Sequence, residues 1–465
     1  NMAKKTKSAD LSIEEKLEQA LVVPGYEPYK IPDNWCWTTV GTVTNIYRGV
    51  SYKKNEGHSE KHMNDCLVLR GGNIQEGSID TETDNVFVNR DLVSGTQIIR
   101  KYDVIIVSST GSKKVIGRAG ISFSDYSDVA FGAFLTLVRA NDYIYKPFIA
   151  YYLQSDIYRN RIRTLASGVN INNIRNEYIT ETPLSLPPLP EQQRIVERIE
   201  SLFSKLDEAK EKAQEVIDSF ETRKAAILHK AFSGELTAKW REENGVGIES
   251  WERKTLGEVC NSIFDGDHMP PPKSESGIPF LVISNVNDGY LSFENTRFVP
   301  QEYYDAITDT RKPEKGDVLY TLVGSFGIPV VVDTNAPFCF QRHMALLKPK
   351  SINTYFLWYL LQSQEMYQKA SSIAKGVAQL TVPIKGLRLM DFNRPSEEEQ
   401  IEIVRILDSL LEKEDTSKDN AESIIDQIET MKKAILAHAF RGELGTNDPE
   451  EESAVELLKR ILTGE

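Results

Sequence analysis

A regular spacing of apolar residues dominates one stretch of the chain. Eight apolar positions follow one another there at alternating intervals of four and three residues: Ile195, Ile199, Leu202, Leu206, Ala209, Ala213, Val216 and Phe220. This heptad pattern predicts a long helix that presents one apolar seam to a partner helix. Pro190 before the seam and Gly234 after it suit a helix start and a helix end.

The same stretch occurs twice. Residues 191–236 align without a gap with residues 399–444, and 23 of the 46 positions are identical. The second copy places Glu414 and Ser417 on the seam, which predicts looser packing in its middle, and otherwise keeps Ile403, Leu407, Leu410, Ala421, Ile424, Ile428 and Ile435. One such helix alone would equally suit an exposed surface helix or a homodimeric coil. Two copies of equal length in one chain favour pairing with each other, and chain connectivity through a globular domain permits an antiparallel coiled coil.

A more divergent segment precedes each copy of the helix. Short β-rich runs bounded by Gly, Asn, Asp and Pro predict strands at Cys66–Leu69, Val104–Val107, Phe280–Ile283 and Val330–Val332. A helix is expected at about 147–163 and again at about 355–369. The Leu-Gln-Ser landmark at 153–155 recurs at 361–363, so the divergent segments are also related. The fold class is therefore α/β (α+β), with two pseudo-twofold-related globular domains separated by the two long helices.

These patterns divide the chain into seven parts. A capping box at Ser12 predicts a helix from there to about Leu21, and Ser453–Leu462 reads as a final amphipathic helix. The predicted parts are an N-terminal helix and tail at 1–30, a first globular domain at 31–185, a first long helix at 186–236, a linker at 237–247, a second globular domain at 248–393, a second long helix at 394–444, and an acidic C-terminal tail with a short helix at 445–465.

Composition narrows the class of protein. The chain has 465 residues, 40% of them hydrophobic and 26% charged, which suits several soluble domains. The uncharged run Val318–Val332 is shorter than the roughly 20 residues of a membrane helix, and glycine and proline break it, so we predict no membrane span. The basic N-terminus lacks the apolar core of a signal peptide. Four scattered cysteines without a CxxC pair favour a reducing cytoplasm.

The net charge of −13 argues at first against nucleic acid as a partner. The charge is uneven, however. Lys and Arg number 18 against 16 Asp and Glu in residues 30–185, and 14 against 16 in residues 248–393. The two globular domains are therefore close to neutral, and the acid excess lies in the other parts.

A search for catalytic constellations finds none. The sequence has neither a GxxxxGK[ST] loop nor a GxGxxG motif, and its histidines have no recurring Ser or Cys partner. His58 and His62 have an i, i+4 spacing that could chelate a metal on a helix, but no third ligand is evident and the surroundings suggest a loop. We therefore predict no metal site, no cofactor on this chain, and no catalysis by the chain alone.

Two loops carry residue types that suit DNA. Ser112, Lys113, Lys114 and Arg118 follow a predicted strand, and the equivalent loop around Ser325 lacks the lysines. Small residues and hydroxyls let a backbone approach a phosphate, and lysines add Coulomb attraction. A glycine hairpin with solvated lysines is the alternative interpretation.

Further polar residues suit base recognition, since Arg pairs with guanine and Asn or Gln pairs with adenine. Strand-end turns use the same residue types and remain an alternative. The candidates are Arg70, Asn73 and Gln75 in the first domain and Ser284, Asn285, Gln341, Arg342 and His343 in the second. Where the second domain has Gln341-Arg342-His343, the first has Gly132-Ala133-Phe134, so two sites on a shared frame would bind different sequences.

The arrangement resembles the specificity (S) subunit of type I restriction-modification systems. The resemblance rests on Leu186-Pro187-Pro188-Leu189-Pro190-Glu191-Gln192-Gln193-Arg194-Ile195-Val196 and Ala231-Phe232-Ser233-Gly234-Glu235-Leu236-Thr237, with weaker echoes at Glu399-Gln400 and 439–444. It covers the chain from about Ile31 to Leu444. The second helix start, at 393–400, lacks the double-proline form, so partner docking could differ between the halves.

The resemblance implies two target recognition domains, each reading one half of a split double-stranded DNA site. Half-sites read from one face would lie about one DNA turn, roughly 34 to 36 Å, apart. The helices would dock two methyltransferase (M) subunits that carry S-adenosylmethionine and methylate adenine, which must leave the base stack. Two motor and nuclease (R) subunits, which use ATP and Mg, would complete a restriction enzyme. The candidate docking and coiled-coil residues are Ile195, Ile199, Leu202, Leu206, Phe220, Ile403, Leu407, Leu410, Ile424 and Ile428.

Two other functions stay open. The chain could be a coiled-coil scaffold whose globular halves bind proteins, in which case it would lack base-specific binding. It could also be a stand-alone methyltransferase or nuclease fused to recognition domains. The absence of a cofactor motif in the sequence weighs against that third interpretation.

Overall fold

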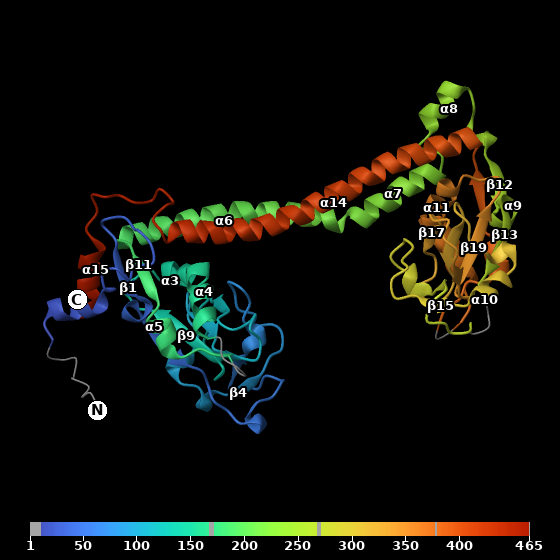
Figure 1. The fold of residues 1–465 in the computed structure, drawn as a ribbon. Helices are drawn as coiled ribbons and strands as arrows, with labels where there is room; N and C mark the ends of the chain where they lie inside the picture. Colours follow the sequence, from blue (N-terminus) through green and yellow to red (C-terminus); the bar gives the residue numbers. More distant parts are fainter. Residues whose placement is uncertain (1–10, 167–171, 267–270, 377–378, 465) are drawn as a thin grey trace. The chain divides into compact units, whose positions relative to one another are not determined.

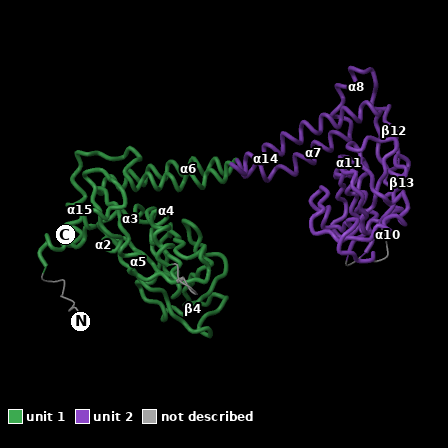
Figure 2. The backbone as a smooth tube through the Cα atoms, in the orientation of Figure 1, with its two compact units in different colours: residues 1–212, 424–465 green, residues 213–423 purple. Residues whose placement is uncertain are grey.

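The computed structural model describes residues 11–166, 172–266, 271–376 and 379–464. Part of the predicted N-terminal tail, residues 1–10, lies outside this range. The chain divides into two compact units (Figure 2). Unit 1 comprises Asn1–Lys212 and Ile424–Glu465, and unit 2 comprises Ala213–Ser423. Each unit therefore contains one globular domain and parts of both long helices.

The elements of unit 1 alternate between short strands and helices (Figure 1). The helices are α1 (Ile13–Ala20), α2 (Val40–Val43), α3 (Lys146–Tyr152), α4 (Asp156–Leu165), α5 (Asn176–Thr180), α6 (Leu189–Asp218, which continues into unit 2) and α15 (Ala454–Thr463). The strands are β1 (Cys36–Thr39), β2 (Thr44–Arg48), β3 (Asp65–Leu69), β4 (Phe87–Asn89), β5 (Val104–Val107), β6 (Ser109–Thr110), β7 (Ala119–Ile121), β8 (Val129–Phe131), β9 (Leu135–Ala140), β10 (Asn172–Asn173) and β11 (Pro183–Leu186).

Unit 2 repeats this order with few changes. Its helices are α7 (Phe220–Phe232), α8 (Ala238–Asn244), α9 (Leu256–Val259), α10 (Gln301–Asp305), α11 (Thr354–Gln362), α12 (Gln364–Ile373), α13 (Ile384–Leu389) and the start of α14 (Glu397–Ala439, which continues into unit 1). Its strands are β12 (Glu252–Thr255), β13 (Cys260–Asp265), β14 (Ile278–Leu281), β15 (Arg297–Val299), β16 (Val318–Thr321), β17 (Pro329–Val331), β18 (Cys339–Phe340), β19 (Met344–Pro349) and β20 (Asp391–Arg394).

Three sheets of unit 1 have a counterpart in unit 2, whereas the two-stranded sheet of β6 and β10 has none among the strands of the described residues. Each unit has a four-stranded antiparallel sheet, ordered β2-β9-β5-β7 in unit 1 and β13-β19-β16-β17 in unit 2. Each also has a three-stranded sheet with one parallel pair, ordered β4-β3-β8 and β15-β14-β18. An antiparallel ladder, β1 with β11 and β12 with β20, closes each domain. The divergent halves of the sequence thus share one architecture.

The central strands explain why the β-rich runs lack an alternating polar pattern. All four residues of β5 are buried, because successive side chains enter two different cores. Val104 and Ile106 join the core against the helices, while Ile105 and Val107 join the core against the three-stranded sheet. In β16, Val318 likewise joins the core against the helices, and Leu319 joins the core against the three-stranded sheet.

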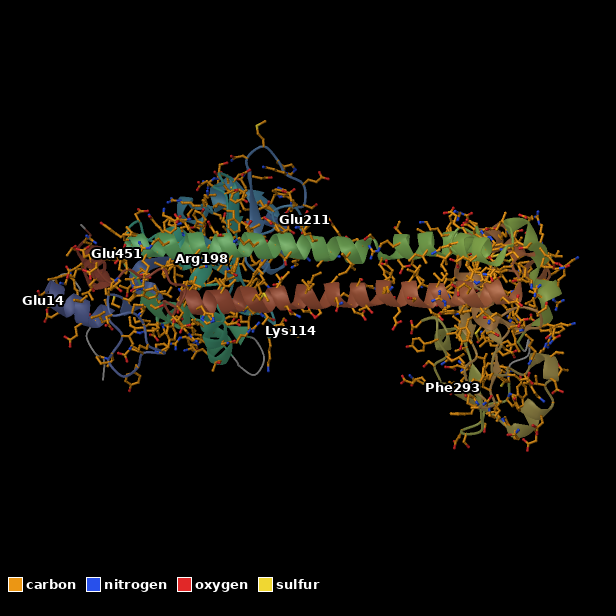
Figure 3. The ribbon with its side chains drawn as sticks, turned by 90° about the horizontal axis from the view of Figure 1, so that it is seen from above. Glu14, Lys114, Arg198, Glu211, Phe293 and Glu451 are labelled. Atoms are coloured by element: carbon orange, nitrogen blue, oxygen red, sulfur yellow. The ribbon has the colours of Figure 1, made fainter. Side chains whose placement is uncertain are left out.

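In each unit the two long helices run antiparallel, as predicted. In unit 1, α6 and α14 lie side by side (Figures 1 and 3), with Lys210 Nζ 2.7 Å from Glu429 Oε1 and Lys432 Nζ 2.5 Å from Asp207 Oδ1. In unit 2, Arg223 Nε of α7 lies 2.6 Å from Glu414 Oε2 of α14. As residue numbers rise along the first long helix, the residue numbers of the salt-bridge partners on α14 fall, which is the antiparallel register.

The C-terminal end of the first long helix packs on the second globular domain, and the C-terminal end of the second long helix packs on the first. Phe440 is fully buried in unit 1, with its ring 5.3 Å from Phe148 and 5.1 Å from Tyr152. Phe232, its counterpart in the repeat, lies 5.4 Å from Phe356 in unit 2. The repeated Ala-Phe-x-Gly-Glu-Leu segments are therefore anchors on the domains, and the glycines allow the chain to leave with φ of 87° at Gly234 and 75° at Gly442.

Three features differ from the sequence expectations. The first long helix is two helices, because α6 ends at Asp218 and α7 begins at Phe220. The hydroxyl of Ser219 donates to the carbonyls of Glu215 (2.5 Å) and Val216 (3.3 Å), and such back-bonding bends helices. The expected helices at 147–163 and 355–369 are each broken as well, because Ser155 and Ser363 cap a new helix.

The seam of α14 also departs from the predicted heptad. Leu411 is buried instead of Leu410, and Ile424 is 44% exposed beside a half-buried Ile425. The buried positions advance by four residues twice, from Ile403 to Leu407 to Leu411. The departure is local, because Ala421 and Ile428 are buried at the positions that the heptad predicts. Such a stutter arises because a straight helix has 3.6 residues per turn rather than 3.5.

The terminal helices form as predicted. Ser12 and Glu15 make the capping box of α1, and Ser453 caps α15. Among the described residues, no helix has both the length and the apolar character needed to cross a membrane.

Candidate nucleic-acid interface

Three loops of unit 1 meet at one edge of its sheets. Strands β3 and β8 are parallel, so they end at the same edge. The Gly132 N–H after β8 donates to the Leu69 carbonyl (2.9 Å), and the Ser108 N–H after β5 donates to the Phe134 carbonyl (3.0 Å). We call residues 70–76, 108–118 and 132–134 the loop edge of unit 1. It gathers all seven candidate DNA-binding residues of the first domain.

The loop at residues 108–118, which we call the lysine loop, is the most exposed part of this edge. Ser112, Lys113 and Lys114 are all exposed, and Lys114 lies at the surface in Figure 3. Within the described part of the chain, neither lysine has a salt bridge. Arg118 is instead half-buried and donates from Nη1 to the Ile74 carbonyl at 3.1 Å, so it joins this loop to the neighbouring one.

A buried arginine of α4 contacts both of these loops. Arg159 Nη1 lies 2.9 Å from Glu76 Oε1, and its Nη2 donates to the Lys114 carbonyl at 3.4 Å. Burial lowers the Arg159 pKa from its ordinary value, and Glu76 opposes that shift. The lysine loop is thus held by α4 while its charged side chains remain free for solvent or phosphate.

The residues that follow β3 divide between surface and structure. Arg70 is exposed and forms an ion pair with Asp84, and the exposed Gln75 donates to the Gly72 carbonyl at 3.2 Å. Asn73 is buried: its Oδ1 accepts the Arg70 N–H at 2.7 Å and its Nδ2 donates to the Thr83 carbonyl at 2.7 Å. The amide of Asn73 therefore holds a strand-end turn, as the alternative interpretation expected.

Unit 2 builds the same frame with different side chains. The Gln341 N–H donates to the Leu281 carbonyl (3.1 Å) and the Leu322 N–H donates to the His343 carbonyl (2.8 Å), which are the counterparts of the Gly132 and Ser108 bonds. Residues 282–287, 322–327 and 341–343 form the loop edge of unit 2. Gln341-Arg342-His343 thus occupies the place of Gly132-Ala133-Phe134.

These three polar residues form a local group. Arg342 is exposed, and the amide nitrogen of Gln341 contacts His343 Nδ1. Burial, with a smaller contribution from the Arg342 charge, lowers the pKa of His343 below its ordinary value. The shift favours the neutral imidazole, in which Nδ1 accepts from the Gln341 amide and Nε2–H remains as a donor.

The remaining candidates of unit 2 mirror those of unit 1. Asn285 is buried, accepts the Val282 N–H at 3.0 Å and donates to the Glu294 carbonyl at 3.1 Å, so it is the structural counterpart of Asn73. Ser284 and Ser325 are exposed. The two asparagines belong to the frame, and the exposed residues belong to its surface.

One exposed aromatic was missed by the sequence reasoning. Phe134 is 70% exposed at the loop edge of unit 1, in the position that His343 occupies in unit 2. The signal in the sequence was an aromatic directly after the Gly-Ala pair that follows β8. Exposed aromatic rings of this kind can contact thymine methyl groups or bases.

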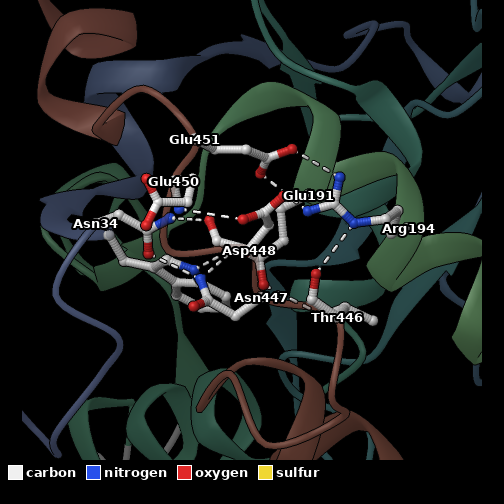
Figure 4. A network of polar contacts seen from close by, with 9 residues as sticks. Asn34, Glu191, Arg194, Thr446, Asn447, Asp448, Glu450 and Glu451 are labelled. Atoms are coloured by element: carbon white, nitrogen blue, oxygen red, sulfur yellow. Dashed lines mark hydrogen bonds and ion pairs between the residues drawn. The ribbon is translucent and has the colours of Figure 1, made fainter.

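A buried carboxylate organises the start of each long helix. In unit 1, Glu191 accepts hydrogen bonds from the Trp35 indole (2.7 Å), Thr446 Oγ1 (3.2 Å) and Asn447 Nδ2 (2.9 Å). Arg194 donates to the Thr446 carbonyl and to both carboxylate oxygens of Glu451 (Figure 4). The C-terminal segment is thereby tied to the first domain.

Unit 2 satisfies the equivalent carboxylate with residues from a different segment. Glu399 accepts from Trp251 (2.8 Å), from Thr237 Oγ1 (2.7 Å) and from Arg241 Nη1 (2.6 Å). The next residue also has one role in both units, where Gln192 and Gln400 are fully buried. Each donates from Nε2 to a proline carbonyl just before the helix and accepts at Oε1 from a backbone N–H of the globular domain, that of Tyr145 or Asn353. The Glu-Gln motif is therefore structural.

The candidate seam residues fall into two groups. Ile195, Ile199, Phe220, Ile403, Leu407 and Ile428 are buried, while Leu202, Leu206 and Leu410 are half-buried and Ile424 is exposed. Ile424 and Met431, both exposed and seven residues apart, lie on one face of α14 within unit 1. This face is available to a partner.

The structure also adds a third residue to the histidine pair. Asp65, the first residue of β3, has Oδ2 2.6 Å from His58 Nε2 and 3.5 Å from His62 Nδ1. Sequence reasoning missed this ligand-type group because the three residues come from a loop and the strand that follows it. The cluster lies at the end of β3 opposite to Arg70.

Comparison with known proteins agrees with this architecture. The chain matches the family described as type I restriction modification DNA specificity domain over residues 32–218 and 248–429. It is 29% identical over 451 residues to the type I restriction enzyme EcoKI specificity subunit of Escherichia coli K12, covering 93% of this chain and 96% of the relative. It is 24% identical over 363 residues to the MjaVIII specificity subunit of Methanocaldococcus jannaschii, covering 75% and 80%.

Solved structures share the fold. The HsdS subunit from Thermoanaerobacter tengcongensis superimposes with a TM-score of 0.59 at 22% identity, covering 90% of this chain and 99% of that one. A chain from work on complex assembly and conformational transition of the type I R-M system gives a TM-score of 0.65 at 22% identity, covering 90% and 100%. The two family matches, the repeated frame and the shared fold together lead to one conclusion. This chain belongs to the family of type I restriction-modification DNA specificity subunits.

Proposed function

We propose that this chain is the non-catalytic DNA-recognition subunit of a methyltransferase and restriction complex, and that it reads a two-part double-stranded DNA site with one half-site per domain. The observation that carries the proposal is the shared frame with exchanged side chains. Gly132-Ala133-Phe134 and Gln341-Arg342-His343 stand at the same place in two loop edges whose backbone hydrogen bonds correspond. Two such surfaces would select two different sequences.

The exposed residues of the loop edges are the proposed DNA contacts. Lys113, Lys114 and Ser112 would approach phosphates, while Arg70, Gln75, Gln341, Arg342 and His343 have donors and acceptors suited to base edges. Ser284 and Ser325 would add contacts in the second domain. The buried Asn73 and Asn285, and Arg118 between the loops, would instead hold the frame.

The long helices are the proposed docking site for two M subunits. Support comes from exposed apolar residues on α14, such as Ile424 and Met431, which a lone coiled coil would not need to expose. In this proposal S-adenosylmethionine is bound by the M subunits, and ATP and Mg by two R subunits where a nuclease is present. A pure scaffold is the competing function, and base-specific binding separates the two.

The test is modification-sensitive long-read sequencing of DNA from cells that carry the cognate M subunit, with and without this chain. We expect a chain-dependent adenine mark at a two-part motif with a fixed gap. Arg342→Ala should relax or abolish only one half of the motif, since a base contact contributes about 1–3 kcal/mol of discrimination. No mark despite copurification of the M subunit would favour the scaffold.

A further inference from the structure

The cluster of His58, His62 and Asp65 lies outside the proposed DNA surface. Asp65 begins β3, whereas the loop edge of unit 1 follows the end of that strand. The imidazole rings of His58 and His62 are stacked with their centroids 4.5 Å apart. The nitrogen and oxygen atoms that the three side chains offer all lie within 4.8 Å of one another.

The chemistry of the three groups selects a class of ligand. Two imidazole nitrogens with one carboxylate oxygen suit Zn²⁺ and other first-row divalent cations, whereas Mg²⁺ and Ca²⁺ prefer oxygen alone. Bonds of about 2.0–2.2 Å in a tetrahedral site place ligand atoms roughly 3.4 Å apart. The separation of His62 Nδ1 and Asp65 Oδ2, 3.5 Å, already meets that requirement.

The backbone holds all three residues in place. His58 pairs with Phe87 of β4, with N–H to carbonyl distances of 3.1 and 2.8 Å in the two directions. Asp65 pairs with Asn89 of the same strand. The His62 N–H donates to Asp65 Oδ2 at 2.8 Å, and the Asp65 N–H donates to the His62 carbonyl at 3.3 Å. Only side-chain rotation is therefore needed to adjust the ligand atoms.

The charges around the cluster favour a cation. Asp65 is buried, with its side chain 5% exposed, while those of His58 and His62 are 33% and 67% exposed. The nearby ammonium of Lys61 is paired with Asp128 at 2.6 Å, so its charge is compensated. A buried carboxylate below two accessible imidazoles leaves an open side for water as a fourth ligand.

We propose that His58, His62 and Asp65 bind one Zn²⁺ ion, with water completing a tetrahedral site. The ion replaces the hydrogen bond between His58 and Asp65, whose atoms move apart from 2.6 Å to roughly 3.4 Å. The site joins the loop that contains both histidines to the first residue of β3. It is a structural clip on the first domain and takes no part in base recognition.

The experiment uses the full chain without a histidine tag, treated with EDTA and exchanged into chelator-free buffer. Co²⁺ is titrated as a spectroscopic probe, and Zn²⁺ is then measured by competition with a chromophoric chelator. We expect one ion per chain and a visible Co²⁺ absorption of tetrahedral type. His62→Ala should weaken binding by at least about tenfold, on the scale seen when a metal site loses a supporting group.

Two controls separate loss of the site from loss of folding. His62 is the most exposed of the three, so its removal should leave the thermal unfolding of the metal-free chain unchanged. His229→Ala removes an exposed histidine of α7 and should leave the stoichiometry at one. The proposal is overturned if the wild-type chain binds no Zn²⁺, or if His62→Ala and Asp65→Asn both bind it as tightly as wild type.

Discussion

At the scale of single residues, the exposed and buried members of the candidate site separate by their hydrogen bonds. The side-chain amides of Asn73 and Asn285 bond to backbone partners through both the oxygen and the nitrogen. Lys113 and Lys114, in contrast, are exposed and are available to a ligand. Residue type alone could not distinguish these cases, because an amide that suits adenine also suits a turn. The candidate list therefore combines exposed residues with residues that hold the turns, and their part in DNA binding stays a prediction.

Replacing Lys113 and Lys114 by alanine should weaken DNA binding about equally for all sequences. The slope of log affinity against log salt should fall by about one for each lost phosphate contact. Lys101→Ala is the matched control, since that exposed lysine precedes β5 and the loop edge follows it. The slope is measured by fluorescence anisotropy from 50 to 300 mM salt. An unchanged slope would indicate that both lysines are solvated and do not contact phosphates.

Glu399→Ala should destabilise unit 2 by about 3–5 kcal/mol, because it leaves the buried guanidinium of Arg241 without its carboxylate. The measurement is denaturant unfolding of the full chain followed by tryptophan fluorescence, since Trp251 donates to Glu399. Glu398→Ala changes an exposed neighbour on the same helix and should have little effect. Equal midpoints for the two variants would contradict the role given to Glu399.

At the scale of elements, the repeat made the long helices predictable but not their details. A heptad seam in two equal copies predicts pairing, and chain connectivity permits the antiparallel register that two salt bridges in unit 1 show. The break at Ser219 and the stutter after Leu407 depend on local back-bonding and on helix twist. Neither leaves a clear mark on the hydrophobic pattern.

Inserting four alanines between Asn244 and Gly245 should lengthen α8 by about one turn. Thr237 and Arg241 would keep their bonds to Glu399, because the inserted residues follow them in an exposed stretch. Residues 237–241 resemble the spacer segment of the specificity-subunit family, whose length sets the gap between half-sites. We therefore expect a methylated motif with a changed gap and both half-sequences intact. Altered half-sequences with the original gap, read by long-read sequencing, would contradict this assignment.

At the scale of the whole molecule, each compact unit is assembled from distant parts of the chain. Unit 1 needs the C-terminal segment, because Thr446 and Asn447 satisfy Glu191 and because Ala454, Leu457 and Leu458 of α15 are buried. The acidic tail that the sequence predicted is therefore a structural part of the first domain.

Removing residues 445–465 should lower the melting temperature of unit 1 by several degrees or more, since it uncovers apolar surface and leaves Glu191 with fewer donors. A shorter truncation after Ser453 keeps the bonds of Thr446 and Asn447 and removes only α15, so its effect should be smaller. Differential scanning calorimetry of the two truncations measures both. Identical melting profiles for all three chains would show that the segment is dispensable.

The sequence by itself determined the two-domain repeat, the mixed α/β class, the pairing of the long helices and the family, because hydrophobic period and motif spacing are local properties that repeat at a fixed distance. The tertiary structure decided which polar residues are buried in turns, that Asp65 meets two histidines, and that Glu191 and Glu399 are held by different segments. The bonds of Glu191 and Glu399 join segments far apart in sequence, which only packing brings into contact. The histidine cluster and the turns join residues close in sequence, but the path of the backbone between them decides which side chains meet, and residue type alone does not report that path.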